Sequence, residues 1–287
     1  MAVVLAVTAA ASPYSSEIEQ WRAKREERLK ADDGWLTVSA LYWLKDGANT
    51  FGNARGNDLV LPASAPPRAG TIDFAGGKAA VRVDPGVRIL CGDKPVTTMM
   101  DLRADTATGG PDVLVLGPLS LQVIERGGRY GIRVKDNESP RRREFAGLRW
   151  YPVSEAHRVV ARFVPHAAPK TIPIANVLGQ EEQLKSPGSV VFKIGDQELR
   201  LDPILEEPDA KQLFFIFKDA TAGRDTYPAG RYLYTELPKD GTVTLDFNKA
   251  FSPPCAFTAY ATCPLPPPQN RLAVRIEAGE KKPPPLH

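Results

Sequence analysis

The chain has 287 residues, of which 43% are hydrophobic and 25% charged, the balance of a globular protein with a sizeable core. Lysine and arginine exceed aspartate and glutamate by only 37 to 34, so the net charge gives no argument for a nucleic-acid partner. No stretch reaches the roughly 18 to 20 apolar residues that a membrane-spanning helix needs, and we expect no integral membrane segment.

The first residues, MAVVLAVTAAAS, are apolar and end in small side chains. Residues 1–14 are therefore either the remnant of a secretory signal, with Ala9-Ala10-Ala11 as a cleavage site, or a short apolar arm. A lysine- or arginine-rich beginning, which signals carry, is missing. The first alternative predicts an exported protein, periplasmic or extracellular, and the second a cytoplasmic one.

Residues 15–34 are predicted to form an N-terminal helix. Ser16 and Glu19 have the spacing of a capping box, and the following residues are good helix formers up to Gly34, a plausible C-terminal cap. Only a few apolar positions mark a stripe, so we expect this helix to lie on the surface and to dock through Trp21. Binding of a partner protein is the alternative use of the helix.

Residues 35–150 change to short β-branched and apolar segments separated by Gly, Pro, Asp and Asn, the pattern of a β-sandwich. The two glycines in Arg126-Gly127-Gly128-Arg129 predict a tight hairpin. The order of elements in NTFG, NDLVLP, CGDKPV and VLVLGPLSLQVI resembles a forkhead-associated (FHA) domain. The phosphothreonine-reading residues of that family do not carry over, because Phe51-Gly52-Asn53 stands where Gly-Arg is usual. The resemblance thus implies a scaffold and not phosphopeptide recognition.

Residues 151–287 predict a second β-rich domain, from strand-like segments such as HRVVARFV, KQLFFIF, GRYLY and GTVTLDFN. Within it, residues 252–272 hold many prolines and two cysteines, and are predicted to form an ordered flap. The fold class expected from the whole chain is mainly β: an N-terminal helix, an FHA-like sandwich and a second β-rich domain.

Several motifs of this second half carry a further resemblance. KDATAGRDTYPAGRYLY, LDFNKAF, SPPCAF, ATCPLPPPQNRL and IEAGE resemble, in this order, a bacterial family known only as a domain of unknown function. The resemblance also takes in DDGWLTVSALYWLKDGANTFG near the beginning of the chain. It implies no established activity, and it agrees with export, since members of the family often begin with an export signal.

Polar residues gather at the ends of strands in the second half. A buried strand that ends in a carboxylate, facing a hairpin with arginine and tyrosine, would place charged groups at the mouth of a pocket. The structural alternative is that turn chemistry and an internal ion pair account for them. The candidate pocket comprises Asp219, Thr221, Tyr227, Arg231, Asp246, Asn248, Cys255 and Asn270.

The three cysteines allow several roles. Cys255 and Cys263 would close a short loop as a disulfide in an oxidising compartment, or remain paired buried thiols. Cys255 as a nucleophile is a further alternative, which needs a nearby base or cation. Cys91 is expected to be a small core residue.

No standard catalytic or nucleotide-binding signature is present, and the three histidines make no metal set, so neither a metal nor a cofactor is predicted. Three functions stay open. The first is a small-molecule enzyme, such as a hydrolase, with its pocket in the second β domain. The second is a non-catalytic module that binds a small anionic ligand. The third is a protein–protein adaptor that uses the sandwich.

Overall fold

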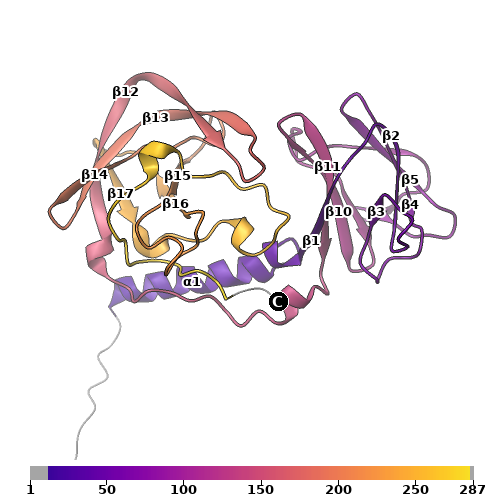
Figure 1. The fold of residues 1–287 in the computed structure, drawn as a ribbon, viewed down its shortest axis with the longest axis horizontal. Coiled ribbons are helices and arrows are strands. Elements are labelled where there is room, and N and C mark those ends of the chain that lie inside the picture. Colours follow the sequence, from indigo (N-terminus) through magenta and orange to yellow (C-terminus); the bar gives the residue numbers. More distant parts are fainter. Residues whose placement is uncertain (1–11, 285–287) are drawn as a thin grey trace, which may run out of the picture.

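A computed structural model describes residues 12–284 and shows two β-rich units joined by a long helix (Figure 1). Helix α1 (Pro13–Lys30) runs beneath the second unit, with its C-terminal end toward the first. Ser12 caps this helix, and its hydroxyl accepts a hydrogen bond from the N–H of Ser15. The capping box predicted at Ser16 was wrong: Pro13, which needs no hydrogen-bond partner for its nitrogen, starts the helix earlier.

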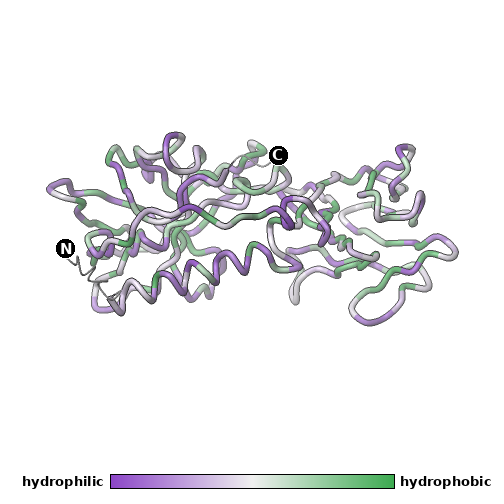
Figure 2. The backbone as a smooth tube through the Cα atoms, turned by 90° about the horizontal axis from the view of Figure 1, so that it is seen from below, coloured by the Kyte–Doolittle hydropathy of each residue, from purple (hydrophilic) through white to green (hydrophobic). Residues whose placement is uncertain are grey.

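Helix α1 is hydrophilic along most of its length, as Figure 2 shows from below. It nevertheless docks through the predicted Trp21, whose ring packs edge-on against Trp150 at 5.8 Å. Tyr14 at its beginning and Arg22 in its middle form hydrogen bonds to other segments. Within the described residues, no helix is long and apolar enough to cross a membrane.

The first unit is a sandwich of a six-stranded sheet, in the order β1-β11-β10-β9-β6-β7, and a five-stranded sheet, in the order β3-β2-β4-β5-β8. Its strands are β1 (Val38–Trp43), β2 (Gly47–Gly52), β3 (Leu59–Val60), β4 (Gly70–Ala75), β5 (Lys78–Val83), β6 (Leu90–Cys91), β7 (Lys94–Pro95), β8 (Met100–Leu102), β9 (Val113–Leu116), β10 (Leu119–Arg126) and β11 (Arg129–Asp136). The mainly β fold with an N-terminal helix is as predicted.

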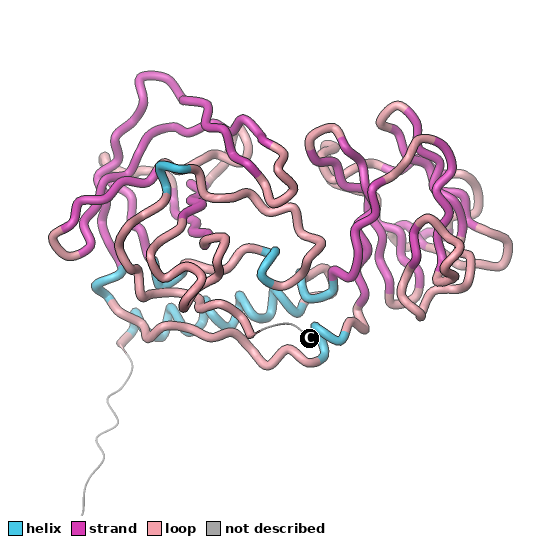
Figure 3. Tube along the Cα trace, in the orientation of Figure 1, coloured by secondary structure: helices cyan, strands magenta, loops and turns pink. Residues whose placement is uncertain are grey.

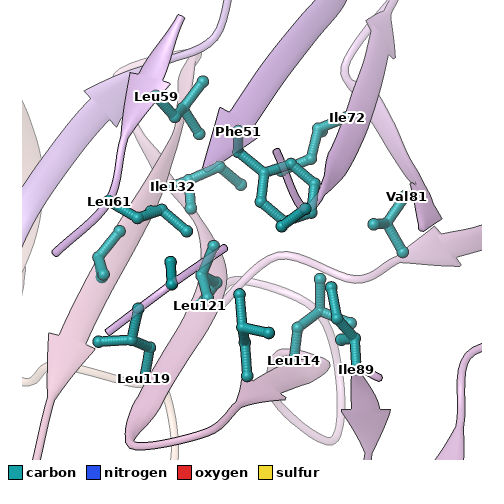
Figure 4. Close-up of a cluster of buried hydrophobic side chains, with 14 of the residues drawn as sticks. Phe51, Leu59, Leu61, Ile72, Val81, Ile89, Leu114, Leu119, Leu121 and Ile132 are labelled. Atoms are coloured by element: carbon teal, nitrogen blue, oxygen red, sulfur yellow. The ribbon is translucent and has the colours of Figure 1, made fainter. Parts of the chain in front are cut away.

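Alternation along these strands turns one side chain in two toward the core between the sheets. Phe51, Ile72 and Val81 of one sheet meet Leu121 and Ile132 of the other there (Figure 4). Cys91 packs against this cluster, partly buried.

The hairpin predicted at Arg126–Arg129 is confirmed. Arg126 pairs with Arg129, and Gly127 and Gly128 have φ of 54° and 75°, which side chains disfavour. As a result β10 and β11 lie in register, so that Ile132 and Val134 face the core and Arg133 between them faces outward.

The second unit contains a four-stranded sheet, in the order β14-β13-β12-β17, and the pair β15-β16. Its strands are β12 (Arg158–Ala175), β13 (Glu181–Ile194), β14 (Gln197–Leu201), β15 (Gln212–Phe217), β16 (Arg231–Glu236) and β17 (Thr242–Asp246). Phe215, Phe217 and Phe247 are fully buried in its main core. Strands β12 and β13 form an unusually long hairpin that extends beyond this core.

After β17 the chain is mainly loop (Figure 3), interrupted by short helical turns. The short helices of the protein are η1 (Trp35–Thr37), α2 (Pro140–Arg143), η2 (Glu155–His157), η3 (Phe247–Lys249), η4 (Pro254–Ala256) and η5 (Pro268–Asn270). Residues 252–272, the segment predicted to form a flap, contact both units, and we keep the name flap for them. Phe257 is buried against Leu29 and Leu36, and the Thr258 hydroxyl donates to the carbonyl of Val38 at 3.1 Å.

Candidate functional site

Arg231 and Asp219, the central residues of the predicted pocket, form a closed ion pair. The Nη2 atom of Arg231 lies 3.0 Å from Oδ1 of Asp219, and both side chains are 1% exposed. The guanidinium also donates to the carbonyls of Ile276 and Ala278, and Asp219 accepts from the Ile276 N–H at 2.8 Å. These bonds use the carboxylate and most of the guanidinium. They join the end of β15, the start of β16 and the last segment of the chain.

Asp246 and Asn248 serve a second structural purpose. Oδ1 of Asp246 accepts from the Tyr14 hydroxyl at 2.8 Å. The Asn248 amide exchanges two hydrogen bonds with the backbone of Ser154, at 3.0 and 2.8 Å. These side chains therefore fasten the start of α1 and the connection before β12 to the second unit.

The other predicted residues are divided among further places. Thr221 donates to Asp219, and Asn270 bonds to the backbone of Asp202 and Ile216, within the second unit. Tyr227 donates to the carbonyl of Cys255 at 2.9 Å. The eight residues thus do not surround one pocket. Strand ends that follow each other in the sequence point here into different interfaces, and their polar groups satisfy one another.

A large cavity instead lies between the two units. Its volume is about 590 Å³, which suits a small organic molecule. It lies among the β10–β11 hairpin, the β12–β13 hairpin, the flap and α1. The residues that line it are Arg25, Trp35, Thr106, Glu125, Arg126, Ile174, Asn176, Glu182, Leu184, Ile204, Glu206, Phe214, Tyr232, Tyr234, Phe251, Pro254, Thr262, Cys263 and Pro264. We call it the interdomain cleft.

One wall of the interdomain cleft is aromatic. Phe214 and Tyr234 stand opposite each other on β15 and β16, and their rings stack at 4.6 Å with planes 13° apart. Phe251 continues the row, nearly parallel to Tyr234 at 6.1 Å, and Tyr232 meets Phe214 edge-on. The three nearly parallel rings, two of them fixed by strand register, make this wall of the cleft apolar.

Charged groups lie around this wall. The Arg25 guanidinium stands 4.6 Å above the Phe251 ring, and its Nε is 3.5 Å from Oε2 of the fully buried Glu280. The Tyr234 hydroxyl donates to Glu206 at 3.0 Å. Partial burial raises the pKa of Glu206, against the effect of this hydrogen bond.

Beside the cleft, at the surface of the sandwich, stands an arginine without a counterion. Arg133 is 5% exposed, and its Nε and Nη2 have no hydrogen-bond partner among the described residues. Its guanidinium lies 5.1 Å from the Trp35 ring. Burial, and then the charge of Arg126, lower the pKa of Arg133 to about 10. A buried cation left unpaired is costly, and is found where a partner is to be bound.

Arg126 extends this positive region into the cleft. It pairs with Asp105 at 2.8 Å, and its Nε donates to the Thr262 hydroxyl at 3.1 Å. The tip of the β12–β13 hairpin closes over it, because Gln180 donates to the Arg126 carbonyl at 2.9 Å. The Val177 N–H binds the Cys263 carbonyl at 3.0 Å, so hairpin and flap form one wall.

Cys255 and Cys263 are adjacent free thiols. The Cys255 N–H donates to Sγ of Cys263 at 3.1 Å, and both sulfurs are reduced. The predicted disulfide is therefore not formed in this structure, while the alternative of paired thiols describes it. Within the described part of the chain, no group of three or more His, Cys, Asp or Glu side chains is placed to hold a metal ion.

Sequence reasoning missed Arg133, Trp35 and the aromatic row. Arg133 stands in RYGIRVKD, where alternation alone places it outside the sandwich core and suggests a solvated side chain. Another unit covers this face in the folded protein, and the local sequence of β11 does not reveal that contact. The one usable signal is GRYLY beside LFFIF. Tyr232 and Tyr234 alternate along one strand, which predicts that both rings lie on the same face of the sheet.

The family described as "protein of unknown function (DUF1684)" matches residues 143–281. The solution structure of an uncharacterized protein from Haloarcula marismortui is 30% identical over 49% of this chain and 79% of that one, with a TM-score of 0.42. The chain belongs to this family of unknown function. No protein of curated function matches it.

Two FHA domains also match the chain. One is the FhaA FHA domain in complex with the intracellular domain of Rv3910, 19% identical over 33% of this chain and 97% of that one. The other comes from work on phosphothreonine-dependent FHA interactions, 19% identical over 33% of this chain and 92% of that one. Both TM-scores are 0.23, and at these values the likeness carries no argument about function.

Proposed function

We propose that the protein binds a small organic anion with a flat ring, such as a cyclic carboxylic acid, in the interdomain cleft. The observation that carries this proposal is Arg133, a buried guanidinium whose Nε and Nη2 have no partner among the described residues. It does not itself line the cleft, but it lies 5.1 Å from the ring of Trp35, which does. A carboxylate would supply the missing hydrogen-bond acceptors and neutralise the charge. Asp219 does the same for Arg231 elsewhere in the chain, where its carboxylate accepts a hydrogen bond from the guanidinium and balances its charge.

The remainder of the cleft fits the body of such a ligand. The row of Phe214, Tyr234 and Phe251 gives an apolar wall against which a ring can pack. Glu125, Glu182 and Glu206 also line the cleft and would accept hydrogen bonds from hydroxyl groups at the far end of the ligand. The acids disfavour a second negative charge there, so the proposed ligand has its anionic group at one end only.

This proposal takes up the small-anion hypothesis and moves it from Arg231 to Arg133. Arg231 is bonded to Asp219 and two carbonyls through Nη1 and Nη2. Its Nε has no partner among the described residues, but the side chain is 1% exposed and has a counterion, which leaves no place for an anionic ligand. The proposal concerns binding and assigns no reaction.

The test is a binding screen with hydroxybenzoates and cyclic sugar acids, read by protein-observed NMR and followed by calorimetry. Binding should be lost by at least roughly tenfold in Arg133→Met, because a hydrogen-bonded charge pair is worth about 1.5–3 kcal/mol. Tyr234→Ala should weaken binding by a similar factor through lost stacking. Arg55→Met, at an exposed arginine on the sandwich, is the matched control.

The proposal fails if no member of the screen binds. It also fails if the ligands bind Arg133→Met as tightly as the wild type, which would place the anion elsewhere.

A further inference from the structure

The two thiols of the flap face different cavities. Cys263 is 3% exposed and lines the interdomain cleft. Cys255, half-buried, lines a second pocket of about 450 Å³ on the flap. The Cys255 N–H donates to Sγ of Cys263 at 3.1 Å, so the two cysteines are direct neighbours between these cavities.

The second pocket is basic. Arg141, Arg149 and Lys282 line it together with Tyr227, and none of its described lining residues is acidic. Nε of Arg141 is buried and has no hydrogen-bond partner in the part of the chain that the structure describes. A pocket with three cations and a thiol attracts an anionic molecule that reacts with sulfur.

The flap holds the two cysteines in place. Phe257 between them is fully buried, and the Thr258 hydroxyl is bonded to the first strand of the sandwich. Prolines flank both cysteines and restrict the backbone further. A hydrogen bond from Cys263, opposed by burial, lowers the pKa of Cys255, while the same contact raises that of Cys263. Because Cys255 is also the more exposed of the two and lines the basic pocket, it is the thiol placed to attack first, and Cys263 is the one that follows.

We propose that Cys255 and Cys263 form a redox-active dithiol that undergoes exchange with an anionic low-molecular-weight disulfide bound in the basic pocket. The Cys255 thiolate attacks one sulfur of the disulfide, forming a mixed disulfide and releasing one thiolate, which takes up a proton. Cys263 then loses its proton and attacks Sγ of Cys255, which forms the internal disulfide and releases the second thiol. The co-substrate is reduced by two electrons and the protein is oxidised by two.

The test uses reduced full-length protein and glutathione disulfide as the probe, with released thiol and protein mass as readouts. The wild type should release two glutathione thiols per chain and retain none, and peptide mapping should find the Cys255–Cys263 disulfide. Cys263→Ser should release one and retain one as a mixed disulfide. Cys255→Ser should react at least roughly tenfold more slowly, because the attacking thiolate is gone. Cys91→Ser is the control and should behave as the wild type.

A second arm tests the basic pocket. Arg141→Gln should slow the reaction with glutathione disulfide by about threefold, through weaker attraction of the anion, and leave that with neutral 2-hydroxyethyl disulfide unchanged. The same change at the exposed Arg55 should affect neither reaction.

Four results would overturn the proposal: a wild type that stops at the mixed disulfide, glutathione found only on Cys91, an undiminished rate in Cys255→Ser, or equal rates of Arg141→Gln and wild type with the anionic probe. Peptide mapping of the wild-type product decides the first two even where a variant does not fold. The experiment is independent of ligand binding in the interdomain cleft, since it measures thiols and not occupancy.

Discussion

Two buried arginines in this chain stand in opposite situations. Arg231 is enclosed within the second unit, with Asp219 as counterion and two carbonyls as further acceptors. Arg133 is nearly as buried, but its Nε and Nη2 have no hydrogen-bond partner within residues 12–284, and its pKa is lowered to about 10, first by burial. The first arrangement stabilises the fold, whereas the second leaves a binding capacity unused. Burial of a charge therefore marks a functional site only where its partners are missing.

The largest expected effect follows from breaking the closed pair. Arg231→Met should lower the free energy of unfolding by about 3–5 kcal/mol, because it leaves Asp219 charged and buried without its counterion. Urea unfolding followed by circular dichroism measures this loss. A decrease below about 1 kcal/mol would mean that Asp219 finds other compensation, and would remove the contrast between the two arginines.

Replacing Arg133 with methionine should have the opposite effect on the free energy of unfolding. Arg133→Met removes a buried charge that nothing balances, and should raise the free energy of unfolding by about 1–3 kcal/mol. The measurement is the same urea titration, with Arg55→Met as the control for a change at the surface. Destabilisation like that of Arg231→Met would show that Arg133 is bonded within the protein in solution.

The buried pair of Arg25 and Glu280 lies between the cases of Arg231 and Arg133, and should give the smallest change in unfolding free energy. Glu280 is fully buried, Arg25 is 3.5 Å away, and neither carboxylate oxygen has a hydrogen bond within the described residues. Burial, opposed by Arg25, raises the pKa of Glu280 above its ordinary value of 4.5. The folded protein therefore holds this proton more tightly than the unfolded chain, and the resulting stability is lost as the pH rises through the folded pKa.

Comparison of the wild type with Glu280→Gln isolates this group. From pH 4 to pH 7 the wild type should lose about 1 kcal/mol of unfolding free energy relative to the variant, which cannot titrate there. Urea unfolding at four pH values would show the trend. A constant difference, or one of opposite sign, would mean that Glu280 is already ionised at the lower pH.

Local chemistry made part of the fold predictable. Gly127-Gly128 between two alternating segments allows one turn type, and the hairpin follows from it. Trp21 is the one tryptophan of a polar helix, so its docking was also predictable. The cap of that helix was misplaced because two serine motifs compete within five residues, and Pro13 decides between them.

The candidate site was less predictable, for a topological reason. The polar residues from Asp219 to Asn270 were expected to meet because they end neighbouring strands, but Asp246 faces α1 and Asn270 faces the β14 end. The cleft combines Glu125 and Arg126 at the end of β10 with Tyr232 and Tyr234 of β16, two strands far apart in sequence. Alternation shows which side of a strand is turned outward, and not what covers that side.

The hairpin tip that closes the cleft is held by few bonds. Ile172 and Ile174 before the tip pack against Ala261 and Cys263 of the flap, and the Ala175 carbonyl accepts from the Leu265 N–H. The tip itself adds one hydrogen bond to the sandwich through Gln180 and one to the flap through Val177, and Val177 and Leu178 are 40% and 42% exposed. Opening the tip therefore costs only a few kcal/mol, far less than global unfolding. We expect the opening and closing of this hairpin tip to set the rate at which a ligand enters and leaves the cleft, independently of overall stability. Amide hydrogen exchange at Val177 would measure that opening directly.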